Sequence, residues 1–211
     1  MEVLVAGGHG QIAQRLLRLL ARRGDRGRGI IRNPDHAADL EALGAEPVLC
    51  DLESDDPRPH VGGAQAIVFA AGAGPGSGDA RKRTMDLGGA LKMIDAAREL
   101  GVARFVMVSS MGTADAEHAG PMRPYLEAKR EADEALMSSG LDWTVVRPGR
   151  LTNEAGTGTV DASRGLGRRG EITRDDTALV LAEALRAPNT IGVAFEVLSG
   201  PTPVAQAVAA L

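Results

Sequence analysis

The first twenty residues constrain the fold of this chain more than any other stretch. Residues 1–6 form a short apolar run, and a glycine-rich turn follows over residues 7–13 (GGHGQIA). Apolar residues then recur at helical spacing as far as Leu20. A strand, a glycine turn and a helix in this order are typical of the opening of a dinucleotide-binding βαβ unit. The plainer alternative is an ordinary strand-to-helix connection, because a single glycine turn is a weak signal.

The small residues of the turn each have a physical role in this interpretation. Gly7 allows a sharp exit from the strand, and Gly10 lets the backbone come close to a pyrophosphate. Ala13 stands where the helix packs closely on the strand. The N-terminal end of the helix offers free N–H groups and a positive dipole end to phosphates. We therefore expect these residues of the turn to bind the cofactor: Gly7, His9, Gly10, Gln11 and Ile12.

Composition argues against several other classes of protein. The chain has 211 residues, which suits one domain, and a net charge of −4. A mildly acidic chain without basic clusters does not favour nucleic acid as a partner. Cys50 is the only cysteine and the four histidines lack ligand spacing, so we expect no disulfide framework and no metal site. There is no signal peptide and no long apolar run, which predicts a cytoplasmic protein without a membrane partner.

Alternating apolar strands and helices predict a single α/β domain over residues 1–211, with a doubly wound parallel sheet (a Rossmann fold) and helices on both faces. Right-handed crossovers give the strand order 3-2-1-4-5-6, with a seventh strand at an edge. The expected strands are residues 1–6, 27–32, 46–50, 66–70, 104–109, 142–147 and 192–198. The expected helices are residues 10–20, 34–43, 81–100, 124–138, 173–186 and 203–211.

Three loops should form the substrate side of the site, at the carboxyl ends of the strands. These loops are residues 72–80, 111–123 and 151–170. Within the last of them, residues 156–169 are polar and glycine-rich, and they form either a short hairpin or a loop over the site. The helix after this loop has a capping pattern, because Thr173 is followed three residues later by Asp176.

Tyr125 and Lys129 are the residues best suited to catalysis. They lie four positions apart on the expected helix 124–138, so they share one face. A lysine ammonium near a tyrosine hydroxyl favours the phenolate, which makes the tyrosine a usable general acid or base. The plainer alternative is an exposed pair on a helix surface. Ser110 follows the fifth strand, where its hydroxyl could bond a substrate carbonyl oxygen. A serine at a strand end is weak evidence by itself, so this role rests on the presence of Tyr125 and Lys129.

Taken with the turn at 7–13 and the segment 147–151 (RPGRL), these residues resemble the short-chain dehydrogenase/reductase superfamily. The resemblance covers nearly the whole chain and is to the atypical or extended branch, whose small members are NAD(P)-binding or epimerase/dehydratase-like. It implies that Tyr125 is the acid/base, that Lys129 holds the nicotinamide ribose, and that Ser110 orients the substrate. It also implies further cofactor-binding residues, namely Asp51 and Leu52 at the adenine, Ala70, Ala71 and Gly72 at its ribose, and Pro148, Arg150 and Leu151 at the nicotinamide amide.

The chain departs from the superfamily pattern in two places. Asp86 stands where many members have an asparagine, which puts a proton relay through that helix in doubt. The chain also ends near Leu211 without the C-terminal substrate lobe of sugar-nucleotide epimerases, so we expect no large nucleotide-sugar substrate.

The end of the second strand decides the expected cofactor. An acidic side chain there would bond the ribose 2′-hydroxyl of NAD. This chain instead has Arg32, and a guanidinium pairs well with a 2′-phosphate, so we favour NADP(H) over NAD(H). The alternative is that Arg32 is a surface residue before a helix.

These observations predict an NADP(H)-dependent oxidoreductase that acts on a small carbonyl or alcohol through Ser110, Tyr125 and Lys129. Three alternatives remain open. The chain could be a dinucleotide-sensing regulator without turnover, or a flavin or quinone reductase whose substrate stacks on the nicotinamide. Epimerase or dehydratase chemistry would use the same residues. The superfamily also suggests a homodimer.

Overall fold

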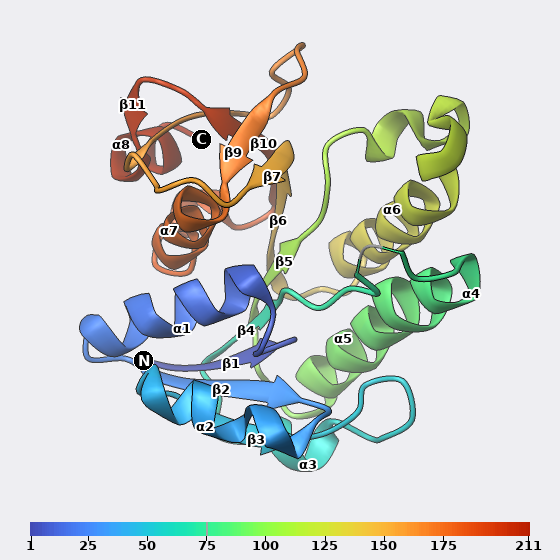
Figure 1. The fold of residues 1–211 in the computed structure, drawn as a ribbon, viewed down its shortest axis with the longest axis vertical. Coiled ribbons are helices and arrows are strands. Elements are labelled where there is room, and N and C mark those ends of the chain that lie inside the picture. The colour runs from blue at the N-terminus through green and yellow to red at the C-terminus, as the bar shows by residue number, and fades with distance from the viewer. Residues whose placement is uncertain (75) are drawn as a thin grey trace.

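The strand that opens the chain, β1 (Glu2–Ala6), lies inside a nine-stranded sheet. This is seen in a computed structural model that describes residues 1–74 and 76–211 (Figure 1). β1 pairs in parallel with β2 (Arg26–Ile31) on one side and with β4 (Ala66–Phe69) on the other. A strand in this position is buried on both faces, which explains why its sequence is a continuous apolar run.

Seven strands of the sheet are parallel, and their order confirms the predicted order 3-2-1-4-5-6. From one end to the sixth strand they are β3 (Glu46–Leu49), β2, β1, β4, β5 (Arg104–Val108) and β6 (Asp142–Pro148). β10 (Val193–Ser199) is the predicted seventh strand and pairs in parallel with β6. The carboxyl ends of these strands therefore all meet at one edge of the sheet.

The prediction of seven strands, with the seventh at the edge, is wrong. The outer side of β10 pairs antiparallel with β8 (Thr159–Ser163), which in turn pairs with β11 (Thr202–Pro203). β8 comes from the polar segment 156–169 and has little apolar alternation, so its sequence gives a weak strand signal. It forms because the open edge of β10 needs hydrogen-bond partners, a demand that arises only in the assembled sheet.

A second, two-stranded parallel sheet was also not predicted. It joins β7 (Arg150–Thr152) to β9 (Glu171–Thr173). Both strands are only three residues long, and they hold together the two ends of the segment expected as the substrate-side loop 151–170. The predicted loop 72–80 includes residue 75, which lies outside the described residues.

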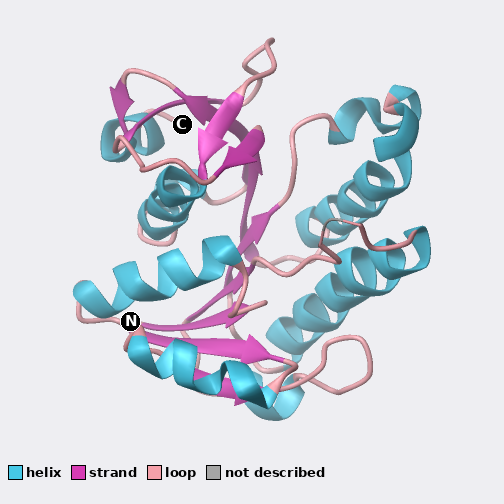
Figure 2. Ribbon diagram, viewed as in Figure 1, coloured by secondary structure: helices cyan, strands magenta, loops and turns pink. Residues whose placement is uncertain are grey.

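Helices cover both faces of the sheet, as predicted (Figure 2). One face carries α1 (Gln11–Arg22), α2 (Ala37–Ala42), α7 (Arg174–Ala184) and α8 (Val204–Ala209). The other face carries α3 (Arg58–Val61), α5 (Ala90–Glu99) and α6 (Arg123–Met137). Short 3₁₀ turns occur at Pro34–His36, Thr113–His118, Gly120–Met122 and Pro188–Thr190.

The helix expected over residues 81–100 is present but is not uniform. It begins as α4 (Asp79–Arg81), passes through a π-helical stretch at Lys82–Gly89, and continues as α5. Such π-helical turns are often found at functional sites. The predicted cap of α7 is confirmed, because the Thr173 hydroxyl accepts a hydrogen bond of 2.9 Å from the backbone N–H of Asp176.

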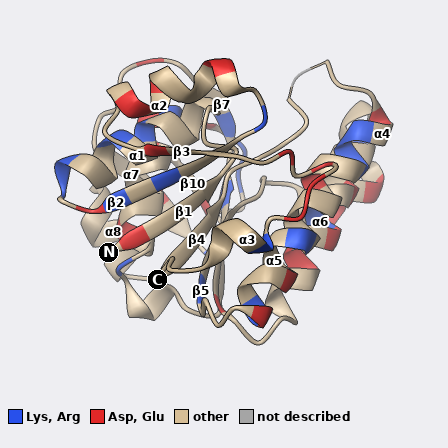
Figure 3. Cartoon of the chain, turned by 90° about the horizontal axis from the view of Figure 1, so that it is seen from below, with Lys and Arg blue, Asp and Glu red and all other residues tan. Residues whose placement is uncertain are grey.

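The core consists of two apolar layers, one on each side of the sheet. Alternate residues of β1 enter different layers, so that Val3 packs below α1 and α7 while Leu4 packs against the α5 side. Charged residues of both signs are interspersed on the helices, whereas the central strands are mostly uncharged (Figure 3). No helix within residues 1–74 and 76–211 combines the length and the apolar character that crossing a membrane requires.

Candidate functional site

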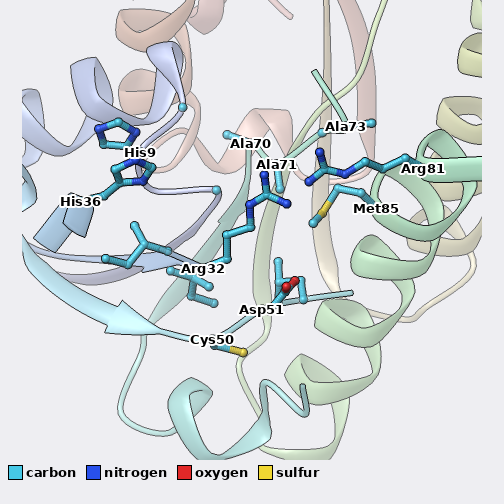
Figure 4. Close-up of a pocket in the computed structure, with 16 residues that line it drawn as sticks. His9, Arg32, His36, Cys50, Asp51, Ala70, Ala71, Ala73, Arg81 and Met85 are labelled. Carbon is cyan, nitrogen blue, oxygen red and sulfur yellow. The ribbon is translucent and has the colours of Figure 1, made fainter. Parts of the chain in front are cut away.

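The glycine turn opens into a pocket of about 290 Å³ at the carboxyl ends of β1, β2 and β4 (Figure 4). Nine of the residues predicted to bind the cofactor line this pocket: Gly7, His9, Gly10, Arg32, Asp51, Leu52, Ala70, Ala71 and Gly72. They come from segments far apart in the sequence. The strand order brings these segments together, since β4 crosses back beside β1.

The turn leaves no space for larger side chains. Gly7 has a φ of +78°, and a Cβ atom there would lie 2.7 Å from the Ala71 Cα atom. A Cβ atom on Gly8 would lie 2.7 Å from the Gly29 Cα atom. α1 begins after Gly10 with no side-chain cap and no acidic residue in its first turn. Its first N–H groups are therefore available to an anion, and the turn fits a pyrophosphate.

Two of the predicted turn residues lie outside the pocket wall. Gln11 is exposed, and its side-chain oxygen accepts a hydrogen bond of 2.8 Å from Arg15. Ile12 is buried, and its side chain packs in the apolar core between α1 and the sheet. Their backbone N–H groups belong to the first turn of α1, so a role in cofactor binding through the backbone stays a prediction for both residues.

Two arginines, Arg32 and Arg81, face each other across this pocket (Figure 4). Arg32 follows β2, and Arg81 ends α4. The carboxylate of Glu53 lies near both, with its Oε2 atom 3.1 Å from Arg81 Nε and 3.8 Å from Arg32 Nη1. A hydrogen bond from Thr84 Oγ1, then the arginines, hold the pKa of Glu53 below its ordinary value. The two arginines of the pocket wall therefore share one carboxylate.

His9 and His36 form a stacked pair on the rim of the pocket. Their ring centroids are 3.5 Å apart with an angle of 11° between the planes. His9 Nε2 also lies 2.8 Å from the Asp39 carboxylate. The sequence predicted a binding role for His9 but gave no signal for His36. His36 lies in the 3₁₀ turn after β2, and only the fold brings it next to His9.

Arg81 was not predicted to line the pocket, since the basic triplet of residues 81–83 is indistinguishable by composition from an exposed helix start. Its position after a strand end and a glycine-rich loop was the available signal. Arg83, two residues further on, is such an exposed helix residue: its side chain is 56% exposed and pairs with Glu131.

A second pocket, of about 710 Å³, opens beyond β5 and β6. Three predicted residues line it, namely Ser110, Pro148 and Arg150. The rest of its wall comes from residues within the segments 111–126 and 167–170, from Gly149 and from Glu196. Leu151 is not in this wall and packs, half-buried, against the core. The predicted substrate loops 111–123 and 151–170 thus meet around one cavity next to Ser110.

Tyr125 and Lys129 lie on one face of α6, as the four-residue spacing predicts. Lys129 Nζ is 5.9 Å from the centroid of the Tyr125 ring and donates a hydrogen bond of 3.2 Å to the Val108 carbonyl. Val108 is the last residue of β5, two positions before Ser110. The lysine is 4% exposed. The structure therefore brings Lys129 to the strand end that leads into the second pocket, while neither Tyr125 nor Lys129 is part of either pocket wall.

Asp86 is the ion-pair partner of Lys129. Its Oδ1 atom lies 3.2 Å from Lys129 Nζ, and its Oδ2 atom accepts a hydrogen bond of 3.0 Å from the Ala73 N–H. Burial by itself would lower the pKa of Lys129, but Tyr125 and then Asp86 outweigh it, and the pKa of Lys129 is raised. The residue that replaces the usual asparagine thus keeps the buried lysine charged.

A second buried ion pair lies one helical turn further along α6. Both Nε and Nη2 of Arg147 donate to Asp133 Oδ2, at 3.1 and 2.9 Å. Burial raises the pKa of the Asp133 carboxyl, and Arg147 opposes this rise. The pair joins α6 to β6 at the start of the 147–151 segment and so fixes the position of the helix that carries Tyr125 and Lys129.

Known proteins resemble this chain over its full length. A family model described as NAD(P)H-binding matches residues 7–188. The uncharacterized sugar epimerase YhfK of Bacillus subtilis is 42% identical over 211 residues, or 98% of each chain. A solved structure from Bacillus halodurans, described as an NAD-dependent epimerase/dehydratase, is 43% identical with a TM-score of 0.97 over 100% of both chains. The oxidoreductase ylbE of Lactococcus lactis is 25% identical, with a TM-score of 0.86 over 100% of this chain and 96% of its own.

Proposed function

Because the chain belongs to the NAD(P)H-binding family of short-chain dehydrogenase/reductase-like proteins, we propose that it is an NADP(H)-dependent oxidoreductase of a small carbonyl or alcohol. One observation carries this proposal. The buried, charged Lys129 lies beside Tyr125 and against the strand end that leads to Ser110. An acid/base pair of this kind, held close to the strand end at which the second pocket opens, is what carbonyl reduction needs.

Three residues of the chain, Tyr125, Lys129 and Ser110, each have one part in the proposed reaction. The nicotinamide, when bound, supplies a hydride to the carbonyl carbon. The Tyr125 hydroxyl gives its proton to the carbonyl oxygen, so that the C=O group becomes a CH–OH group. Lys129 stabilises the phenolate that remains, through its positive charge. Ser110 donates a hydrogen bond to the same oxygen, as in an oxyanion hole. The reverse steps oxidise the alcohol.

The test of this mechanism is Tyr125→Phe, which removes one oxygen atom. NADPH binding should stay close to that of the wild type, while turnover of a carbonyl panel falls about 10²- to 10⁴-fold. Trp143→Phe is a control substitution of another aromatic residue. Trp143 lies near the start of β6, at the end of the strand opposite to the second pocket. Wild-type turnover of flavins or quinones by Tyr125→Phe would instead support a stacked-acceptor reductase. Tight NADPH binding with no turnover by either protein would support a sensor.

The proposed preference for NADP(H) rests on Arg32 and Arg81. A 2′-phosphate between these two guanidinium groups would take the place that the Glu53 carboxylate holds. Arg32→Ala or Arg81→Gln should weaken NADPH binding by about 1.5–3 kcal/mol, the range for a charged hydrogen bond, and leave NADH binding nearly unchanged. Arg83→Gln is the control on the same helix. Equal losses for both nucleotides in calorimetric titrations would refute the 2′-phosphate assignment.

Epimerase chemistry is a second candidate, because the two relatives at 42% and 43% identity carry epimerase names. The same Tyr125 and Lys129 would then oxidise and re-reduce one carbon, so no net NADP(H) would be consumed. Inversion of a substrate stereocentre with no net change in NADPH absorbance would identify this activity. Steady NADPH oxidation would identify the reductase.

A further inference from the structure

The second pocket combines an apolar wall with a basic one. The apolar side comes from Met111, Met122 and Leu126, in and around the 3₁₀ turns before α6. Met122 is 52% exposed, so its side chain is accessible to a ligand in the pocket. The basic side comes from Arg150 on β7 and from Arg168 and Arg169, which precede β9. At about 710 Å³ the cavity has the size of a drug-like ligand site.

Both acidic residues in the wall have contacts of their own, of which the Asp115–His118 pair is exposed. Asp115 lies 2.7 Å from His118 Nδ1, and Glu196 Oε2 accepts a hydrogen bond of 2.8 Å from the Leu166 N–H. The three arginines therefore outnumber the two acids of the lining, and the acids have partners of their own.

The arginines differ in how firmly they are held. Arg150 pairs with Glu171, and Arg168 pairs with Asp161, but these arginine side chains are 72% and 50% exposed. Exposed pairs of this kind contribute only about 0–1 kcal/mol, so an incoming anion can compete for them. Across residues 1–74 and 76–211, no carboxylate oxygen lies within 4.0 Å of an Arg169 side-chain nitrogen. Arg169 is therefore the wall cation most open to a ligand.

We propose that the substrate is an amphipathic carbonyl compound with an anionic group at the end remote from the carbonyl. Its carbonyl would lie at Ser110, its apolar body against the methionine side, and its anion on Arg169, with Arg150 or Arg168 as a second donor. This inference rests on the proposed function, because it assigns the substrate class of the same site. Arginine suits the role since its fork of donors matches a carboxylate or phosphate.

The test uses two aldehydes that differ in one charge, 4-carboxybenzaldehyde and its neutral methyl ester. With the wild type and NADPH, kcat/KM for the acid should exceed that for the ester by about 10-fold or more, since a charged hydrogen bond is at stake. Arg169→Gln should lower kcat/KM for the acid about 10- to 100-fold, mainly through KM, and leave the ester unchanged. Arg169→Lys should recover part of the loss.

Arg164→Gln is the matched control, because Arg164 is exposed in the same loop but is not part of the pocket wall. Equal turnover of acid and ester, unaffected by Arg169→Gln, would overturn the inference and leave the proposed function standing. If neither aldehyde is reduced, the proposed function fails for these compounds, and calorimetric binding of the pair decides the inference. Tighter binding of the acid that is lost in Arg169→Gln supports it, and equal binding overturns it.

Discussion

Replacing Asp86 by asparagine should reveal the buried ion pair with Lys129 as a large change in stability. The two side chains are 1% and 5% exposed, and their charged atoms are 3.2 Å apart. Asparagine keeps the shape and an oxygen for the Ala73 N–H, so the substitution removes mainly the charge. Leaving one charge of a buried pair without its partner costs about 3–5 kcal/mol. We expect Asp86→Asn to lose that much free energy of unfolding in urea at about pH 7.

The pH dependence gives this prediction its sign. In the wild type the pKa of Lys129 is raised above its ordinary value of 10.5, so its contribution to stability is present below 10.5 and lost as the pH rises through the folded value. Asp86→Asn removes the carboxylate that opposes burial, so the pKa of Lys129 should fall below its wild-type value. The penalty would then be relieved as the pH rises towards 10.5, and the gap between the two proteins should narrow.

A matched control lies a few residues earlier in the same helix. Asp79 pairs with Lys82 at 2.9 Å but is 70% exposed, so Asp79→Asn should cost only about 0–1 kcal/mol. If Asp86→Asn costs no more than Asp79→Asn at neutral pH, or if its deficit does not shrink in alkali, Asp86 does not hold a charged Lys129.

Three further predictions concern separate parts of the chain. Burial, together with Asp55, raises the pKa of Cys50 from 9.0 to about 11, so its thiol should react with Ellman's reagent about 100-fold more slowly in the native protein than in urea. Thr173→Ala removes the cap of α7 and should lower the free energy of unfolding by about 0.5–2 kcal/mol in urea titrations. Gly7→Ala places a Cβ atom 2.7 Å from Ala71 at a φ of +78°, so it should cost at least about 1–3 kcal/mol and weaken NADPH binding.

The parallel part of the sheet could be predicted from the sequence, because its strands are apolar runs separated by helices. The crossover rule then limits the strand order to few possibilities. β8 could not be predicted in the same way. Its sequence TVDAS contains one fully buried apolar residue, Val160, and the strand exists because β10 offers an unpaired edge. A signal that arises from the assembled sheet cannot be read from local periodicity.

Contacts within one helix could be predicted from the sequence, because residue spacing decides which side chains are neighbours. Contacts between two elements could not, because they depend on how the elements pack. The spacing of Tyr125 and Lys129 places them together on any helix. The sequence also showed that Asp86 departs from the superfamily pattern, but not that its carboxylate lies between Ala73 and the lysine. Asp86 lies within the π-helical stretch at Lys82–Gly89, whose geometry an α-helical periodicity does not predict. With a carboxylate there, the charge of Lys129 is balanced inside the protein, and the same residue holds the Ala73 backbone in the wall of the first pocket.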